Sequence, residues 1–139
     1  MGTYSRSRCR EWALQFLYQS EFSGPPDIGA LERFWSHFQD GGTLPAYLKE
    51  LVAGVGAHLE ELDALIVRHS EHWRLERMTV VDRNLLRLAI YELLYQPEIP
   101  TKVVINEAVE MAKRYGSEAS GGFINGILDQ VRLAVGREV

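Results

Sequence analysis

The sequence predicts an all-α protein, a bundle of about six to seven helices, and three observations support this. Apolar residues recur at three- and four-residue intervals in successive segments, as on one face of a helix. No segment shows the alternation of polar and apolar residues that is typical of a half-buried strand. Stretches rich in glycine and proline separate the segments. The chain has 139 residues, 46% of them hydrophobic, so we expect one domain over residues 1–139.

The first two helices are predicted from apolar stripes that end at turn residues. The first is expected to begin within the Arg6–Arg10 cluster and to end before the sequence "SGPP" at residues 23–26. Its apolar side carries Cys9, Ala13, Phe16 and Leu17. The second is predicted from Ile28 to Phe38 and is closed by Gly41-Gly42.

The third helix is predicted to be the longest and to run unbroken from about Pro45 to His69. Its apolar repeat consists of Leu48, Val52, Val55, Leu59, Leu62 and Ile66. Gly54 and Gly56 lie inside it, and each costs about 1 kcal/mol of helix propensity relative to alanine. We therefore expect close helix packing at these two glycines.

The sequence "MTVVDRNLLRLAIYELLY" predicts the central helix of the bundle, because its leucines, isoleucine and alanine cover more than one face. Thr79 and Asp82 have the spacing of a capping box, with aspartate in place of the usual glutamate or glutamine. A further helix follows Pro100 and ends at Gly116. The last helix is predicted to carry Phe123, Ile124, Ile127, Leu128 and Val131.

Positive charge is concentrated at the start of an acidic chain. Arg6, Arg8 and Arg10 give the first ten residues a charge of +3, which leaves −7 on the other 129 residues of a chain whose net charge is −4. An acidic body with one basic segment attracts a polyanion to that segment alone. We expect residues 1–8 to form a flexible basic arm that becomes ordered on a partner, the alternative being a solvated arm without one.

Several classes of protein are not supported by the sequence. It has no apolar run of about 18 residues and no signal-peptide pattern, so we expect a cytoplasmic protein that does not enter a membrane. The lone Cys9 is expected to be a buried structural thiol. No phosphate loop or nucleophile elbow is present, and we expect neither an enzyme nor a cofactor. His69 and His72 lack a third ligand, so no metal is expected, and a metallohydrolase is the weakest alternative.

Phe123 is a candidate base-stacking residue. It follows Ser120-Gly121-Gly122 at a predicted helix start, where free backbone N–H groups favour an anion and a ring can stack on a base. Phe123 also lies four residues before Ile127, so a place in the core is the alternative interpretation.

The sequences "RCREWALQFLY", "VVDRNLLRLAIYELLY" and "IPTKVVINEAVEMAKRYGSEASGGFINGILD" resemble the NusB family of bacterial transcription antitermination factors. The resemblance covers nearly the whole chain and is weakest between residues 23 and 75. It implies two packed three-helix sub-bundles. It also implies binding of boxA-type single-stranded leader RNA together with the ribosomal protein NusE. With other Nus factors on RNA polymerase, such a complex promotes read-through of ribosomal RNA operons.

The resemblance also assigns roles to residues. It implies RNA contacts by Arg6, Arg8, Arg10, Lys102, Ser117, Glu118 and Phe123. It implies NusE contacts by Tyr18, Phe22, Asp82 and Arg83. Ala119 stands where the family often has an acidic residue, and Gly122 near a position that is often bulky or charged. The alternatives are the RNA-binding domain of an RNA cytosine methyltransferase, and a protein adaptor or homodimer.

Overall fold

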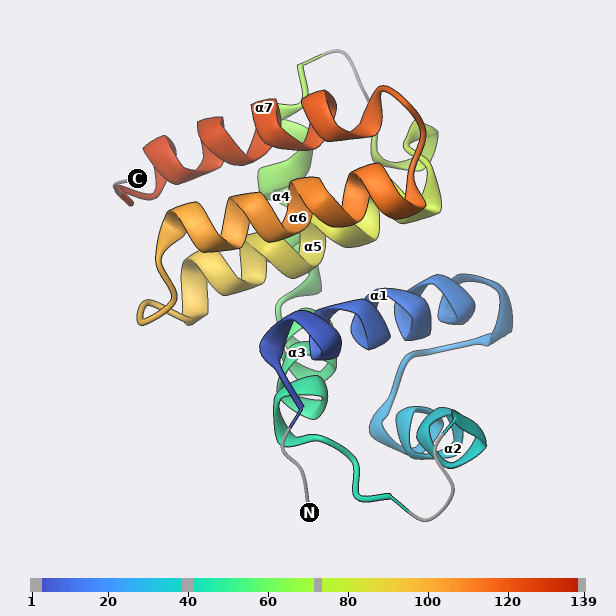
Figure 1. Ribbon diagram of the computed structural model, residues 1–139. Coiled ribbons are helices and arrows are strands. Elements are labelled where there is room, and N and C mark those ends of the chain that lie inside the picture. The colour runs from blue at the N-terminus through green and yellow to red at the C-terminus, as the bar shows by residue number, and fades with distance from the viewer. Residues whose placement is uncertain (1–3, 39–41, 72–73, 138–139) are drawn as a thin grey trace. The chain divides into compact units, whose positions relative to one another are not determined.

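A computed structural model describes residues 4–38, 42–71 and 74–137 (Figure 1). The described residues form seven α-helices, one short 3₁₀ helix and no strand, which confirms the all-α prediction. The chain divides into two compact units, Met1–Ala57 and His58–Val139, each of which is described separately. The helices are α1 (Arg6–Ser23), α2 (Ile28–Phe38), α3 (Ala46–Ala57), α4 (Leu59–His69), the 3₁₀ helix η1 (Leu75–Arg77), α5 (Val80–Tyr95), α6 (Thr101–Tyr115) and α7 (Ser120–Ala134).

The first unit is a three-helix bundle in which α1 and α2 both contact α3. Edge-to-face aromatic pairs join α1 to α2. Such pairs bury large apolar surfaces and favour a defined ring geometry. The ring centres of Trp12 and Trp35 are 4.8 Å apart, and those of Phe16 and Phe34 are 5.3 Å apart. The α3 side of this core is formed by Leu48, Leu51, Val52 and Val55, all buried.

The start of α1 differs from the predicted flexible arm. The helix begins at Arg6, and the backbone N–H of Arg8 donates a hydrogen bond of 3.1 Å to the side-chain oxygen of Ser5. This serine cap satisfies one of the N–H groups that a helix start leaves unpaired. Residues 6–8 are therefore the first turn of a helix, whereas residues 1–3 of the predicted arm lie outside the described residues.

The predicted helix from Pro45 to His69 is two helices. α3 ends at Ala57, α4 begins at Leu59, and His58 between them has φ −116° and ψ 21°. The prediction of one unbroken helix is wrong because the apolar periodicity continues across a single residue, His58, whose backbone angles are not helical. Gly54 and Gly56 lower the helix propensity just before this break.

We expect Gly56→Ala to raise the free energy of unfolding by about 0.5–1 kcal/mol, because alanine is the better helix former and restricts the unfolded chain. A Cβ atom at Gly56 would meet no atom within 4 Å, so close packing does not explain this glycine. Urea unfolding of the wild type and the variant measures the change. A variant that is less stable than the wild type would show that the break needs a glycine at this position.

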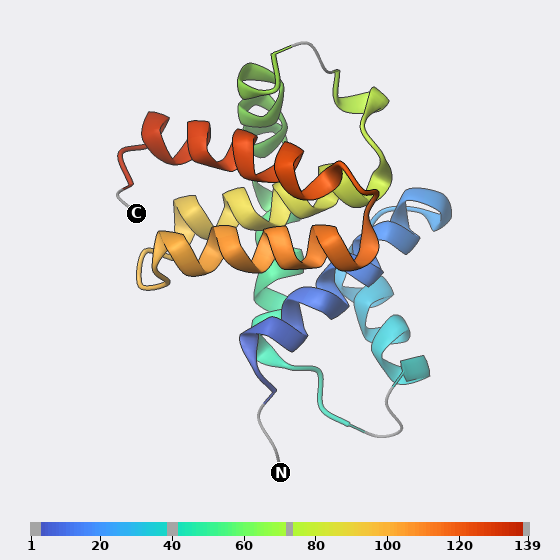
Figure 2. The same cartoon turned by 45° about the horizontal axis from the view of Figure 1, so that its top comes forward.

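The second unit is built around α5, which contacts α4, α6 and α7. Its buried apolar residues cover more than one face, as predicted for a central helix; they are Leu85, Leu86, Leu88, Ala89, Ile90, Tyr91 and Leu93. Figures 1 and 2 both show α6 and α7 side by side and antiparallel, joined by the short connection that precedes Ser120. None of the described helices is both long and apolar enough to cross a membrane.

Polar contacts fix the ends and sides of this second unit. Thr79 caps α5, accepting a 3.1 Å hydrogen bond from the backbone N–H of Asp82 as the capping-box spacing predicts. Arg87 on α5 makes a bidentate ion pair with Asp63 on α4, with N–O distances of 2.7 and 3.0 Å. Such a two-bond geometry fixes both position and orientation, so it holds α4 against α5.

The chain beyond α7 turns back onto the connection between α5 and α6. Gly136 has a positive φ of 79°, a conformation that favours glycine at a helix end. The Arg137 guanidinium then donates hydrogen bonds to the carbonyl oxygens of Gln96 and Ile99, at 2.8 and 2.9 Å. It also donates to the hydroxyl of Thr101 at 3.1 Å, so one side chain binds two residues of the connection and the first residue of α6.

Candidate nucleic-acid interface

Two of the three predicted N-terminal arginines lie on the surface of the first unit. Arg6 and Arg8 are exposed in the first turn of α1. The guanidinium carbon of Arg8 lies 4.8 Å from the centre of the Trp12 ring, and that of Arg6 lies 5.3 Å from the centre of the Tyr47 ring. Arg8 also pairs with Glu11 at 3.1 Å. Stacking on aromatic rings restrains these cations while their charge remains near solvent, where a phosphate can reach it.

Arg10 corrects the predicted RNA-binding set. Its side chain is only 4% exposed, so it does not belong to the same surface as Arg6 and Arg8. A buried guanidinium needs compensating partners within the fold, and its removal affects folding first. The i, i+4 spacing does place Arg6 and Arg10 on the same side of α1. Spacing alone does not show that the fold buries this side at Arg10 and leaves it exposed at Arg6.

In the second unit, the connection between α6 and α7 is a tight turn. The backbone N–H of Ser117 donates a 2.9 Å hydrogen bond to the Ser120 hydroxyl oxygen, and the two serine hydroxyls lie 3.2 Å apart. A Cβ atom on Gly116 would come within 2.5 Å of that Ser120 oxygen and 2.8 Å of the carbonyl oxygen of Ala112. The turn therefore requires glycine at position 116, and it fixes where α7 and Phe123 begin.

Two of the predicted RNA contacts, Ser117 and Glu118, are exposed on this turn. α7 starts without a side-chain cap, so the positive end of its helix dipole lies beside them. Phe123 is half-buried. Its side chain is therefore neither fully buried in the core nor fully exposed, and part of the ring is accessible for stacking.

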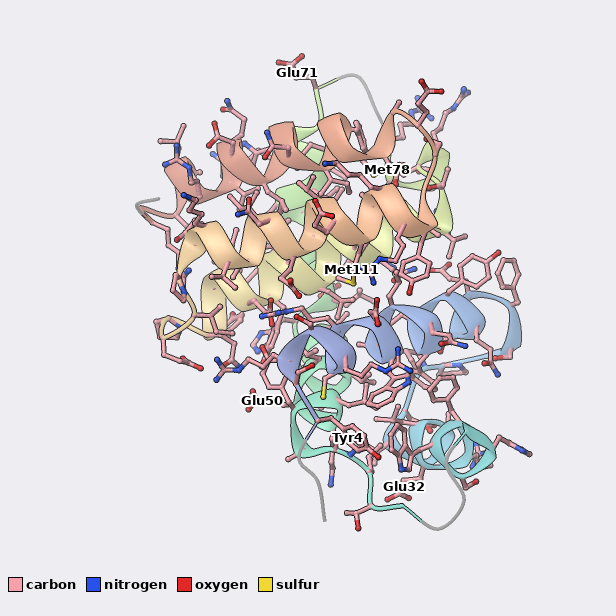
Figure 3. All side chains as sticks on the ribbon, viewed as in Figure 1. Tyr4, Glu32, Glu50, Glu71, Met78 and Met111 are labelled. Carbon is pink, nitrogen blue, oxygen red and sulfur yellow. The ribbon has the colours of Figure 1, made fainter. Side chains whose placement is uncertain are left out.

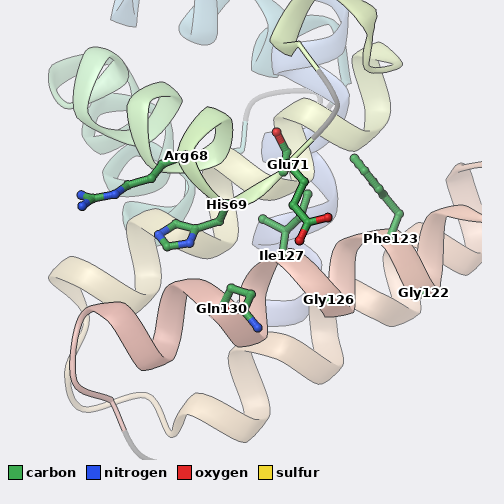
Figure 4. A pocket seen from close by; sticks show the side chains of 9 residues that line it. Arg68, His69, Glu71, Gly122, Phe123, Gly126, Ile127 and Gln130 are labelled. Atoms are coloured by element: carbon green, nitrogen blue, oxygen red, sulfur yellow. The ribbon is translucent and has the colours of Figure 1, made fainter.

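The Phe123 side chain borders a cavity of about 550 Å³, which we call the His69 cavity (Figure 4). It is lined by Arg68, His69, Ser70, Glu71, Gly122, Phe123, Gly126, Ile127 and Gln130. Figure 4 shows the Phe123 ring projecting from α7, with Glu71 and His69 on the segment across from that helix. The His69 Nε2 atom is buried and has no hydrogen-bond partner among the described residues. Gly122 and Gly126 leave this face of α7 open, since Cβ atoms there would meet nothing within 4 Å.

Phe123 also borders a second, smaller cavity of about 240 Å³, which we call the Asp82 cavity. Its lining residues are Arg77, Met78, Thr79, Asp82, Ser117, Ala119, Ser120 and Phe123. Figure 3 labels Met78 at the end of the second unit where α6 turns into α7. Asp82 is 8% exposed, and its Oδ1 atom has no hydrogen-bond partner among the described residues.

The structure does not bring Lys102 to this site. Lys102 is exposed in the first turn of α6, whereas Ser117 and Phe123 follow the other end of that helix. Fifteen helical residues separate the two ends by about 20 Å, at 1.5 Å per residue. A contact between Lys102 and RNA would therefore involve a different part of the RNA from a base on Phe123.

The residues predicted to contact a protein partner differ in exposure. Tyr18 and Phe22 on α1 are 45% and 71% exposed, and their ring centres are 5.4 Å apart. Exposed aromatic residues are enriched at the centres of protein interfaces, so this pair suits a protein partner. Arg83 is half-buried and donates a 2.8 Å hydrogen bond to the Met78 carbonyl oxygen. Asp82, in contrast, faces the cavity described above.

Two further predictions concern reactive side chains. Burial raises the pKa of the Cys9 thiol, which is 1% exposed, so the thiolate is disfavoured and a structural role fits. Among the described residues no group of three metal-ligating side chains is found. His72 lies outside the described residues, so the structure does not test the predicted pairing of His69 and His72.

Surface arginines together with a partly accessible aromatic ring are typical of a protein that binds single-stranded RNA. Comparison with known proteins gives the family. The NusB family model matches residues 7–132, and the chain belongs to the NusB family. It is 47% identical over 137 residues to the transcription antitermination protein NusB of Myxococcus xanthus, covering 96% of this chain and 98% of that protein. It is 50% identical over 130 residues to NusB of Anaeromyxobacter dehalogenans, covering 93% and 91%.

Solved structures agree with this assignment and with the fold. The NusB structure from T. maritima superimposes with a TM-score of 0.81 at 41% identity, covering 94% of this chain and 92% of that one. A chain from a crystal structure of the antitermination factors NusB and NusE in complex with dsRNA superimposes with a TM-score of 0.79. The solved chain is 30% identical to this one, and the match covers 93% of this chain and 96% of the solved chain. These relatives are antitermination factors, and no enzyme family is indicated.

Proposed function

We propose that this chain is a transcription antitermination factor that binds boxA-type single-stranded leader RNA together with the ribosomal protein NusE. With other Nus factors on RNA polymerase, it promotes read-through of ribosomal RNA operons. The observation that supports this most strongly is the near full-length match to NusB proteins, one of which was solved with NusE and RNA. The mechanism is binding alone: the protein links an RNA signal to the transcription complex.

The RNA is bound by cations and by one aromatic ring. Arg6 and Arg8 neutralise phosphates, which supplies affinity that depends on salt and not on sequence. Phe123 stacks on an unpaired base, with Ser117 and Glu118 at the edge of the same site. Lys102 is a further proposed phosphate contact at the far end of α6. NusE is bound through Tyr18 and Phe22, whose exposed rings are buried in the complex, and through the region of Asp82 and Arg83.

The experiment that tests this function is a fluorescence titration with a short boxA-like RNA and a scrambled control, each with and without NusE. We expect the boxA-like RNA to bind more tightly than the control and to bind more tightly still when NusE is present. Equal binding of both RNAs, or of neither, would instead favour a protein adaptor or a homodimer. Sedimentation of the free protein would then distinguish those two.

The double substitution Arg6→Gln with Arg8→Gln is expected to make RNA binding less dependent on salt. Each phosphate contact contributes about 0.7 to the slope of log affinity against log salt for a single strand, so the slope should fall by about 1.4. A matched control removes two exposed positive charges elsewhere in the first unit, by Arg33→Gln with Lys49→Gln. If both double variants change the slope equally, the effect comes from net charge and Arg6 and Arg8 are not contacts.

A further inference from the structure

We propose that the His69 cavity holds an unpaired nucleotide of the bound RNA, whose base stacks on the Phe123 ring over Gly126 while Arg68 binds a phosphate of the same strand. This site rests on the proposed RNA-binding function and specifies which side of the Phe123 ring the base occupies. It also adds a residue of α4 to the RNA contacts, whereas the contacts predicted from the sequence include none on that helix.

The first support is an open groove along α7. Gly122, Gly126 and Gln130 follow one another at four-residue intervals, so they form one row on the helix surface. All three are exposed, and Cβ atoms on the two glycines would meet nothing within 4 Å. The buried side chain of Ile127 adds apolar surface to the lining. A flat ring can therefore approach the helix backbone beside Phe123, where a row of larger side chains would exclude it.

The second support is the size of the cavity and its aromatic wall. The volume of about 550 Å³ lies within the range of pockets that hold small organic ligands, which is about 300–1,000 Å³. The half-buried Phe123 ring forms one wall, and every base has a face that can stack on such a ring. The side-chain amide of Gln130 offers a donor and an acceptor to the edge of the base. The cavity therefore suits an unpaired base of any of the four kinds.

The third support is the distribution of charge around the cavity. Arg68 is exposed, and its guanidinium has no ion pair or hydrogen bond among the described residues, so its charge is available to a phosphate. Figure 4 shows Arg68 on α4 and Phe123 on α7 at opposite ends of the cavity, with Glu71 between them. A carboxylate repels a phosphate, so the neutral base is expected near Glu71 and the phosphate at Arg68. The Nε2 atom of His69 is covered by the protein and is not one of the contacts.

The surroundings of the cavity favour RNA as its occupant. Phe123 is the residue of α7 that the family resemblance assigns to RNA, and it lines the cavity. An exposed arginine near an aromatic ring suits a single strand, because the arginine neutralises a phosphate while the ring stacks on a base. A strand that passes the 117–118 turn and stacks on Phe123 would therefore continue into the His69 cavity.

The position of the base is tested by Gly126→Leu, which fills the cavity beside Phe123 and starts from a Cβ that meets no atom within 4 Å. Anisotropy titration with the boxA-like RNA in the presence of NusE measures the affinity. We expect binding about tenfold weaker than that of the wild type, within the range for loss of one base stack. The salt slope should not change, because no phosphate contact is removed. The matched control is Gly56→Leu, the same change at a helical glycine of the first unit with equally free space, and it should bind as the wild type does.

The phosphate contact is tested by Arg68→Gln. This variant should lower the slope of log affinity against log salt by about 0.7, the contribution of one phosphate on a single strand. The matched control is Arg33→Gln, which removes an exposed arginine of the first unit and should leave the slope unchanged. Thermal melting confirms that the variants are folded.

The outcomes separate this site from the proposed function. Wild-type affinity of Gly126→Leu, or an unchanged salt slope in Arg68→Gln, would overturn the nucleotide site and leave RNA binding elsewhere on the protein intact. Weaker binding of NusE by Gly126→Leu in the absence of RNA would assign the cavity to a protein side chain, and the inference would be wrong. Failure of the wild type to bind the boxA-like RNA with NusE would overturn the proposed function itself.

Discussion

Replacing Phe123 by alanine is expected to weaken binding of a boxA-like RNA by about 5- to 150-fold, because one base–aromatic stack contributes about 1–3 kcal/mol. The ring is half-buried at the start of α7 and borders both the His69 and the Asp82 cavities. Its removal takes away the proposed surface on which a base lies. Anisotropy titration at a fixed salt concentration measures the loss.

The control for this prediction is Phe123→Tyr, which keeps an aromatic face and should retain most of the affinity. The slope of affinity against salt should be the same in Phe123→Ala and in the wild type, because stacking releases no counterions. RNA affinity of Phe123→Ala equal to that of the wild type would place the RNA elsewhere on the protein. A reduced salt slope would show that the variant has disturbed the phosphate contacts instead.

Gly116→Ala is expected to lower the free energy of unfolding by about 1–3 kcal/mol, the usual cost of forcing extra atoms into a filled site. The added Cβ would lie 2.5 Å from the Ser120 hydroxyl oxygen and 2.8 Å from the Ala112 carbonyl oxygen. The serine can turn aside, but the carbonyl belongs to the backbone of α6 and cannot. The 116–120 turn must therefore open, which displaces the start of α7 and with it Phe123.

This prediction has two readouts and one matched variant. Urea unfolding gives the stability change, and RNA titration under native conditions should show weaker binding although Gly116 is not among the proposed RNA contacts. Gly126→Ala adds the same atom within α7, where a Cβ meets nothing within 4 Å, and should not destabilise the protein. Equal stability of Gly116→Ala and the wild type would mean that the turn is loose enough to admit a side chain.

Most of the helices could be predicted because apolar residues recur along them at helical spacing and turn or capping residues stand at several of their ends. Thr79 caps α5 and Gly116 follows the last residue of α6, as the sequence indicates. The break at His58 was not predictable in this way, because one residue with non-helical angles leaves the apolar repeat on either side intact. The only indication of the break in the sequence was the low helix propensity of Gly54 and Gly56, which precede His58.

The candidate site was predicted less completely than the fold. The family resemblance pointed to Phe123 and to the 117–118 turn, and the structure places these residues beside one another. The two cavities were not foreseen, since Met78 and Asp82 are far from Phe123 in the chain, and so is His69. Only tertiary packing brings them together. Burial of Arg10 was missed for the same reason, because a charge pattern carries no information on depth.

The contact between Arg137 and the connection of α5 to α6 joins the last described turn of the chain to a segment some forty positions earlier. The Ile99 carbonyl oxygen accepts from Arg137, and the Gln96 carbonyl oxygen accepts both from Arg137 and from the backbone N–H of Ile99, so this side chain adds to the bonds that hold the connection. Opening at either place should release the other, and the two segments should therefore exchange amide hydrogens as one cooperative unit. Slow motions at the end of the chain and at the α5–α6 connection would then share a single rate.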